Sequence, residues 1–318
     1  MSRLSTATIN VPLTTYAYGL MQDRLALYAL ANLICPIVQV GPATGNYKIF
    51  DDRNAFLAED MTRPIGGPRK RITIDASSGT YNCTPYGVEV PVDDFELALA
   101  GGGTQNPVAE ELLTQGKMRS MISKKATGYA QRVTNFVFAN LTPVPQRGNF
   151  SNPDIDPIDQ LDEQLDAIAT DTGTTENKNV IISVTDWRKI RSNAQVKKRL
   201  GVQTGLVLTR QQLVDGLLYP VNLVISGVSA TTVGRGQATL TSGQKKQIMA
   251  GYTLFVHTEP NATINDASAF KCFSTSSALV DAVKTYREEN SNSDIHAMDW
   301  SEAITQTGPL CARLLAVT

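Results

Sequence analysis

The sequence contains few of the residues that build metal centres and disulfide frameworks. It has two histidines, His257 and His296, and neither lies close in sequence to a cysteine. The four cysteines are widely scattered and form no C-x-x-C pair; they are Cys35, Cys83, Cys272 and Cys311. This pattern indicates four reduced, mostly buried thiols in a cytosolic product, and it predicts no metal site.

The sequence also lacks a large excess of charge of either sign. Its 29 lysines and arginines against 30 aspartates and glutamates give a formal net charge of −1. A dedicated nucleic-acid binder usually has a strong basic excess. The composition therefore argues against that class, but it leaves open a protein that only lies near nucleic acid.

Several signals of targeting and catalysis are missing as well. The first ten residues are polar and contain no apolar signal-peptide core. The apolar-rich stretch from Leu25 to Val40 is interrupted by polar residues and is too short for a membrane span, which needs about 20 apolar residues. The P-loop, G-x-G-x-x-G and G-x-S-x-G patterns are absent. We therefore expect no membrane contact, no cofactor and no catalytic residue.

What the sequence does contain is typical of a folded chain of more than one part. Hydrophobic residues make up 42% of the 318 positions and charged residues 19%, which is ordinary for a globular protein. The length exceeds what one minimal core needs, so we expect about two subdomains.

The chain begins with a helix and a short strand. Apolar residues recur at helical spacing over Thr14 to Ile34, and Pro36 ends that pattern. Ile37 to Val40 then predicts a short strand. A short arm precedes the helix.

The segment from Gly41 to Pro85 differs in character from what precedes it. Turns rich in glycine and proline separate two short strand patterns, Tyr47 to Phe50 and Arg71 to Ile74. The segment has too few apolar residues for a core of its own, and an isolated hairpin is marginal in water. We therefore expect an extended two-stranded loop that lies on another part of the chain or on a neighbour.

A strand that contains proline follows this loop. Tyr86 to Glu96 alternates like a strand, and Pro91 within it removes one ladder hydrogen bond, so we expect an edge strand or a bulge. The strand ends in an acidic cluster. Gly101 to Gly103 then forms a flexible joint.

The next segment predicts one very long helix. Asn106 can cap it, Pro107 suits its first position, and the pattern continues to Leu141, roughly 50 Å at about 1.5 Å per residue. Its expected apolar face comprises Leu112, Met118, Ile122, Ala126, Tyr129, Val133, Phe136 and Val137. A compact enzyme core rarely uses a helix of this length.

After a proline-rich boundary at Pro143 to Pro157, helices and strands alternate. The expected helices are Ile158 to Thr170, a helix capped by Asp186, Ala194 to Leu200 and Gln211 to Leu217, and the expected strands are Val180 to Val184, Val221 to Ser226 and Tyr252 to Thr258. The pattern predicts a small inserted α/β domain of about 100 residues.

The densest carboxylate group comprises Asp93, Asp94 and Glu96. A general acid/base pair would need a pocket and a shifted pKa, and no histidine or nucleophile lies nearby in sequence. We interpret the group as a solvated or ion-paired turn. The sequence leaves open whether the fold brings a catalytic partner close to these carboxylates.

A basic run in the extended loop is the other candidate contact group. Arg69, Lys70 and Arg71 are consecutive, and Arg63 precedes them. These residues could be merely solvated, could pair with carboxylates of a neighbouring subunit, or could touch phosphate. His257 is expected to be a hydrogen-bonded structural residue.

The order of these parts resembles the major capsid proteins of tailed bacteriophages, which have the HK97-like fold. The resemblance extends over essentially the whole chain. The segment VPVDDFE (Val90 to Glu96) is similar to the family's strand that leads toward the spine helix, and VIISVTDWRKI (Val180 to Ile190) is similar to an axial-domain strand followed by an Asp-Trp helix start.

The resemblance implies an α+β fold with named parts. An N-terminal arm and helix would occupy residues 1–40, the extended loop 41–85 and the axial domain 156–250. The peripheral domain, with its spine helix at about 107–141, would comprise 86–155 and 251–318. The arm leaves no room for a long fused scaffolding segment, so a separate scaffolding protein or none is implied. No residue of this chain, Lys48 included, is singled out for the covalent cross-link of some members.

The resemblance also implies a function and partners. The chain would be a non-enzymatic shell protein that assembles with itself, as hexamers and pentamers, into an icosahedral head in the host bacterial cytoplasm. Packaged double-stranded DNA would lie on the inner face without sequence-specific contact, and portal, decoration and scaffolding proteins are further partners. Subunit-contact candidates are Arg63, Arg69, Lys70, Arg71, Asp93, Asp94 and Glu96.

Two rival functions stay open. One is a cellular nanocompartment shell, similar to an encapsulin, with the same fold. The other belongs to a different class, a soluble α/β enzyme that uses Asp93, Asp94 or His257.

Overall fold

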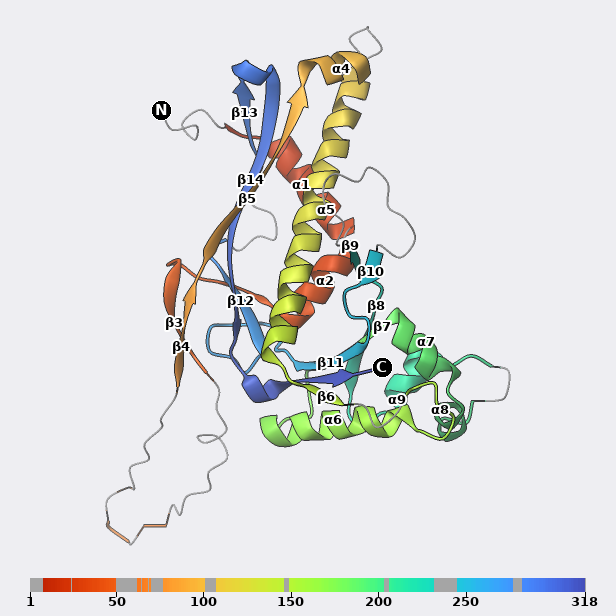
Figure 1. The fold of residues 1–318 in the computed structure, drawn as a ribbon. Coiled ribbons are helices and arrows are strands. Elements are labelled where there is room, and N and C mark those ends of the chain that lie inside the picture. Colours follow the sequence, from red (N-terminus) through yellow and green to blue (C-terminus); the bar gives the residue numbers. More distant parts are fainter. Residues whose placement is uncertain are drawn as a thin grey trace.

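The longest helix, α5 (Pro107–Asn140), is the element along which the others are arranged. In the computed structural model (Figure 1), helices α1 (Val11–Asp23) and α2 (Leu25–Ile34) and a twisted sheet lie alongside α5, and a second sheet lies at its C-terminal end. The structure describes residues 8–23, 25–49, 62–63, 65–67, 69, 77–100, 107–145, 149–202, 206–231, 245–276 and 282–317.

The larger sheet has the strand order β1-β13-β14-β12-β2, with β5 also paired to β14. Its six strands are β1 (Thr8–Ile9), β2 (Ile37–Gln39), β5 (Thr84–Asp93), β12 (Phe270–Ser274), β13 (Lys284–Glu288) and β14 (Ser293–Gln306). β14 pairs antiparallel with β5 and β13 along its first part and with β12 along its last part. Among the described strands β5 pairs with β14 alone, which confirms that Pro91 marks an edge strand.

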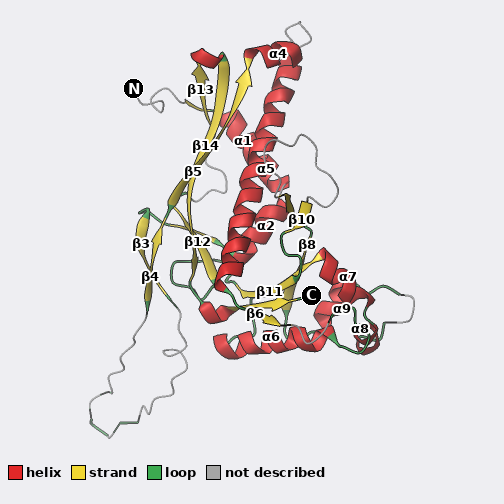
Figure 2. Cartoon of the chain, viewed as in Figure 1, coloured by secondary structure: helices red, strands yellow, loops and turns green. Residues whose placement is uncertain are grey.

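The second sheet has the order β6-β15-β11-β7-β8. Its strands are β6 (Pro143–Pro145), β7 (Lys178–Ser183), β8 (Val221–Ser226), β11 (Tyr252–His257) and β15 (Ala312–Ala316). Four helices pack around it (Figure 2), namely α6 (Pro157–Thr172), α7 (Val184–Ser192), α8 (Ala194–Arg199) and α9 (Arg210–Asp215). We call this sheet and its four helices the five-stranded lobe. Strands from segments 156–250 and 251–318 share this sheet.

One face of α5 forms the centre of the larger core. Met118, Ile122, Ala126 and Val133 are fully buried among residues of α2, β11, β12 and β14. Leu112, which the sequence pattern assigned to the same face, is 63% exposed, so that assignment is wrong. The first turns of α5 contact α4 (Asp94–Ala100), a helix with no buried residue, and so they have no core to enter.

Stacked cations and aromatic rings attach α5 to the larger sheet. The Lys125 amine lies 4.5 Å from the centre of the Trp300 ring, and Trp300 stacks on Tyr86 with ring centres 5.9 Å apart. The Arg132 guanidinium lies 4.5 Å from the centre of the Tyr86 ring and pairs with the buried carboxylate of Glu302. Each desolvated cation–ring contact contributes about 1–2 kcal/mol. The stack therefore fixes the rotation of α5 against β5 and β14.

The base of the extended loop is a two-stranded ladder, β3 (Thr44–Lys48) with β4 (Ser78–Asn82). Tyr81 lies across Gly45 and Tyr47 across Gly79, and a Cβ atom at either glycine would collide with the opposite ring. Both tyrosine rings also pack on Phe273 of β12. Aromatic rings thus cover glycines that would otherwise weaken each strand.

Several predicted boundaries in this part of the chain were wrong. Ser77, Ser78 and Gly79 are turn signals in the sequence, yet Ser78 and Gly79 belong to β4, while the strand predicted at residues 71–74 lies outside the described residues. The predicted strand through Glu96 ends at Asp93, and α4 begins at Asp94.

Two helix starts were also misplaced. The first helix begins at Val11 rather than Thr14, because the side-chain oxygen of Asn10 accepts from the Leu13 N–H at 3.1 Å. The cap of α7 is Ser183, whose hydroxyl accepts from the Asp186 N–H, and not Asp186 itself. The long helix and most later elements lie within a few residues of their predicted positions.

The burial of α5 predicts different costs for two similar truncations on the same helix. Ile122→Ala should lower the free energy of unfolding by about 2–5 kcal/mol, because it leaves a cavity in the core. Leu112→Ala should change it by about 0.5 kcal/mol or less. Denaturant unfolding of both variants measures the difference. Equal effects would contradict the packing described for α5.

Candidate contact surfaces

The predicted acidic cluster lies where β5 passes into α4, at the N-terminal end of α5. Asp94 forms a bidentate pair with Arg287 of β13, with N–O distances of 2.7 and 2.5 Å. Glu96 pairs with Lys117 of α5, and the same amine donates to the Pro91 carbonyl at 2.8 Å. Asp93 accepts the Phe95 N–H at 2.7 Å. All three carboxylates thus have partners within the chain.

The electrostatics of this cluster favour ionised carboxylates. The hydrogen bonds from Arg287 hold the pKa of Asp94 below its usual value, and the contact with Lys117 does the same for the pKa of Glu96. A general acid would need the opposite shift. The cluster therefore ties α4 to β13 and α5, and the ion-paired interpretation is the one that fits.

Large apolar side chains surround these carboxylates. Four of them are exposed on α4 and the first turns of α5: Phe95, Leu99, Val108 and Leu112. We call these four residues, with Asp94 and Glu96, the tip surface. Apolar side chains rimmed by charges are typical of a surface that contacts another protein. The sequence pattern did not reveal this surface, because the predicted strand included Phe95 and no element was predicted at Leu99.

The structure does not bring Arg63 and Arg69 to the tip surface. Arg63 and Arg69 are exposed on the extended loop, where Arg63 donates to the Gly67 carbonyl at 3.3 Å. Lys70 and Arg71 lie outside the described residues. In Figure 1 strands β3 and β4, from which the loop extends, lie well away from α4 at the tip surface. Any carboxylate partner for these arginines from the tip would have to come from another copy.

His257 lies far from the acidic cluster. It ends β11 in the five-stranded lobe, whereas Asp93 and Asp94 lie at the opposite end of α5 (Figure 1). The buried His257 ring contacts the Glu259 carboxylate at 3.2 Å, and Asn177 donates to the other oxygen of Glu259 at 3.0 Å. His257 is thus hydrogen-bonded, and the three residues of the enzyme hypothesis do not form one site.

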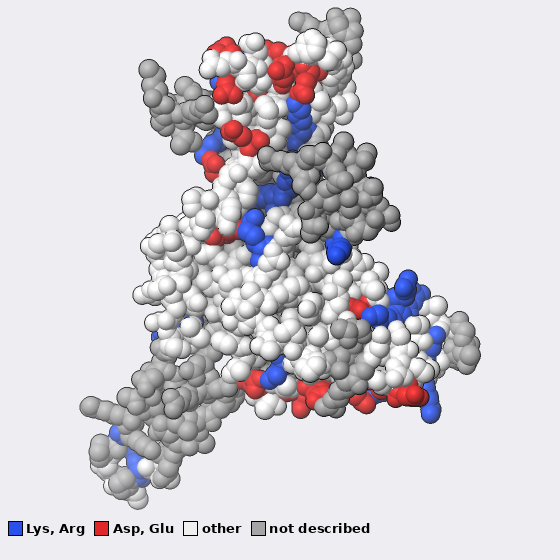
Figure 3. Space-filling model, in the orientation of Figure 1, with Lys and Arg blue, Asp and Glu red and all other residues white. Residues whose placement is uncertain are grey.

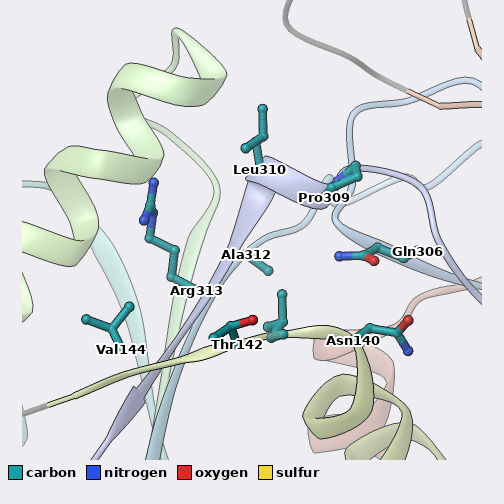
Figure 4. A pocket seen from close by; sticks show the side chains of 9 residues that line it. Asn140, Thr142, Val144, Gln306, Pro309, Leu310, Ala312 and Arg313 are labelled. Atoms are coloured by element: carbon teal, nitrogen blue, oxygen red, sulfur yellow. The ribbon is translucent and has the colours of Figure 1, made fainter.

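The cavity shown in Figure 4 lies between the end of α5, β6 and β15 and has a volume of about 260 Å³. Arg313 is the charged residue among those that line it, and its guanidinium donates to Asp171 of α6 at 2.6 Å. A guanidinium already engaged in this way offers no acid, base or nucleophile. The cavity is a space between packed elements rather than a catalytic pocket.

The cysteines are free and buried, as their pattern in the sequence indicated. Burial raises the pKa of Cys35, Cys83 and Cys272, the last to about 12, so these three are inert thiols. Within the described ranges, no group of three histidine, cysteine or acidic residues is placed to hold a metal ion. No helix in that same part of the chain has the length and apolar character to cross a membrane.

Sequence reasoning also missed the role of Arg199. It took the basic end of α8 as solvated, but Arg199 contacts three aspartates of the α6 region, Asp156, Asp159 and Asp162. The sequence did contain a sign of this pairing, namely an acidic helix followed by a basic one. Pairing across about 40 residues cannot be read from either helix alone.

No protein-family model matches the sequence, and no curated protein matches it in sequence. Solved structures do match. A phage-related protein from Bordetella bronchiseptica has a TM-score of 0.71 at 15% identity, covering 98% of this chain and 97% of that one. The capsid of cyanophage P-SCSP1u has a TM-score of 0.56 at 11% identity, covering 90% and 86%.

An encapsulin has a comparable likeness. The holo-encapsulin complex from Synechococcus elongatus has a TM-score of 0.52 at 13% identity, covering 91% of this chain and 87% of that one. Because these matches span nearly the full chain, they show that it has the mixed α+β, HK97-like fold that the sequence resemblance predicted.

The bidentate pair of Asp94 and Arg287 leads to a prediction about the pKa of Asp94. In Arg287→Gln the pKa of Asp94 should rise toward its ordinary value, because the stabilising hydrogen bonds to the ionised carboxyl are lost. In the unaltered chain this stabilisation is present above the unfolded-state pKa and is lost as pH falls through the lower folded-state pKa. Carboxyl NMR titration of Asp94 measures the shift.

Lys117→Gln is the matched control for that titration. It should raise the pKa of Glu96 and leave that of Asp94 in place. An Asp94 carboxyl that titrates identically with and without Arg287 would contradict the pairing.

Proposed function

We propose that this chain is a major capsid protein, a structural subunit that assembles with itself into an icosahedral head enclosing phage double-stranded DNA. The observation that carries the proposal is the likeness of nearly the whole chain to a phage-related protein and to a phage capsid. The contacts of the candidate catalytic residues also support the proposal, because Asp94, Glu96 and His257 each pair with another side chain of the chain.

The parts of the subunit follow from the same proposal. Residues 1–40 form the arm and first helices, 41–85 the extended loop, and α5 the spine of a peripheral domain formed by 86–155 and 251–318. Residues 156–250 form the axial domain. Strands β11 and β15 of the peripheral segment complete the axial sheet by pairing with β7 and with each other. The two domains would therefore move little against each other.

The proposed mechanism of assembly is multivalent burial. A subunit held by several neighbours gains from many contacts at once, although each contact is weak. The tip surface and the base of the extended loop, β3 and β4, lie apart from each other (Figure 1), so each can contact a different neighbour. Near-neutral net charge suits close packing of many copies, since a large like charge would repel.

Further partners and the location of the protein belong to the proposal as well. Packaged DNA would lie on the inner face without sequence-specific contact. Separate scaffolding, portal and decoration proteins would complete the head, which would assemble in the bacterial cytoplasm and remain part of the virion.

The second candidate is a nanocompartment shell. The likeness to the encapsulin complex favours it as a specific alternative, with a TM-score close to that of the cyanophage capsid. The two candidates share fold and self-assembly, and they differ in what the shell encloses.

Electron microscopy of the purified chain tests the shared part of the proposal. We expect capsomers or closed shells, because the fold presents contact surfaces at both ends. A chain that stays monomeric over a wide range of concentration and salt would contradict it. Nucleic acid inside particles from infected cells would favour the capsid, and particles filled with protein would favour the nanocompartment.

The basic run of the extended loop supplies a second test. We propose that Arg69, Lys70 and Arg71 pair with carboxylates of an adjacent subunit, and Asp93, Asp94, Glu96 and Arg63 are the other contact candidates. Reversing the three charges to glutamate should reduce shell yield about tenfold or more, since each tenfold change needs only about 1.4 kcal/mol, while circular dichroism stays unchanged. Lys124→Glu, an exposed cation of α5, is the matched control. Normal assembly of the triple variant would refute the pairing.

A further inference from the structure

Charge is strongly segregated within the five-stranded lobe. Residues 148–177 contain eight acidic residues and no lysine or arginine, whereas residues 187–214 contain seven lysines and arginines and no acidic residue. The net charge of −1 for the whole chain conceals this division. Two adjacent segments of one lobe thus carry large charges of opposite sign.

The fold places the two charged segments on different sides of the lobe. On α6 the exposed Asp159, Glu163 and Asp166 lie at helical spacing, opposite its buried leucines and isoleucines. On α7 and α8 the exposed bases include Arg188, Arg191 and Lys198. Figure 3 shows red atoms along the side that α6 occupies and blue atoms over α7 and α8. We call these six residues the acidic face and the basic face.

The basic segment keeps most of its charge, whereas the acidic segment is partly neutralised, with Asp171 paired to Arg313 of β15. Arg199 spans the two segments and contacts three aspartates, and Lys189 pairs with Asp186 at 3.2 Å. Five other cations have no carboxylate within 4 Å among the described residues; they are Arg188, Arg191, Lys197, Lys198 and Arg210. The basic face therefore keeps a positive field that an external partner can use.

The lobe also exposes apolar side chains next to its charged segments. Leu206 and Val207 are 57% and 50% exposed and lie in sequence between Arg199 and Arg210. Leu218 is 62% exposed, and its N–H donates to Asp162 of α6 at 2.9 Å. Apolar groups at the centre and charges at the rim are the usual composition of a protein–protein interface.

We propose that the basic face of one copy contacts the acidic face of the next, so that lobes join head to tail into a ring. The inference rests on the proposed function and identifies the surfaces through which subunits of one capsomer contact each other. Two different, complementary surfaces on one subunit make a heterologous contact, and such contacts generate rings when the rotation closes. A second copy fits better than DNA, because DNA would use the basic face and leave the acidic face unpaired.

Two charge-reversal variants test this contact. The first, Arg191→Glu with Lys198→Glu, makes both faces acidic. The second, Glu163→Lys with Asp166→Lys, makes both faces basic. Each variant alone should yield about tenfold fewer rings and shells, because like charges then oppose each other at every contact. Lys246→Glu, an exposed cation on β10 (Lys245–Gln247), is the matched control and should assemble normally.

Mixing the two variants gives the sharper readout. An alternating arrangement pairs opposite charges at every contact, so the mixture should form rings again. Alternation requires an even number of subunits, so six-membered rings should return and five-membered rings should not. Electron microscopy counts ring symmetry, and thermal unfolding with circular dichroism checks that both variants fold.

The outcomes separate this inference from the proposed function. Folded variants that each assemble normally, or a mixture that restores nothing, would overturn the head-to-tail contact. Loss of encapsulated nucleic acid by the first variant, with normal shells from both, would also overturn it and assign the basic face to DNA. An unaltered chain that forms no rings or shells would instead contradict the proposed function.

Discussion

The packing of one face of α5 is the interaction on which the rest of the structure depends. A helix of 34 residues spans roughly 50 Å and gains most of its stability from tertiary packing rather than from propensity. From Met118 to Val137 its buried face contacts α2 and both sheets through one continuous core. Without this buried face of α5, the two sheets would have no helix on which both pack. The first turns of α5 extend beyond this core, and there the chain exposes the apolar side chains of the tip surface.

β14 connects the strands beside the tip surface to the strands near the C-terminal end of α5. Its first residues pair with β5 and β13 beside the tip surface, and its last residues pair with β12. A short 3₁₀ turn (Pro309–Cys311) then leads into β15, which lies inside the second sheet. The stack of Lys125, Trp300, Tyr86 and Arg132 holds β14 and β5 against α5. The tip and the lobe are therefore ends of one continuous framework.

Local signals were enough to predict the elements that depend on local chemistry. Pro107 and Pro143 bracket α5, and its length follows from them and from the 3.6-residue period. β4 was missed because Gly79 is a turn signal in sequence, and only the ring of Tyr47, some thirty residues away, makes it a strand. The partners of the acidic cluster were equally hidden, since Arg287 lies 193 residues from Asp94. The sequence could name the carboxylates but not the cations that hold them.

The net charge of this chain does not reveal how its charged residues are distributed. A total of −1 argues against a dedicated nucleic-acid binder, yet the same chain carries eight acids and seven bases in two neighbouring segments. An isolated exposed ion pair contributes about 0–1 kcal/mol, too little to hold two subunits. Around a closed ring each subunit makes the contact twice, and breaking one subunit free must break both. Segregated charge on a neutral chain can therefore specify how copies join, while the absence of net charge allows many copies to pack.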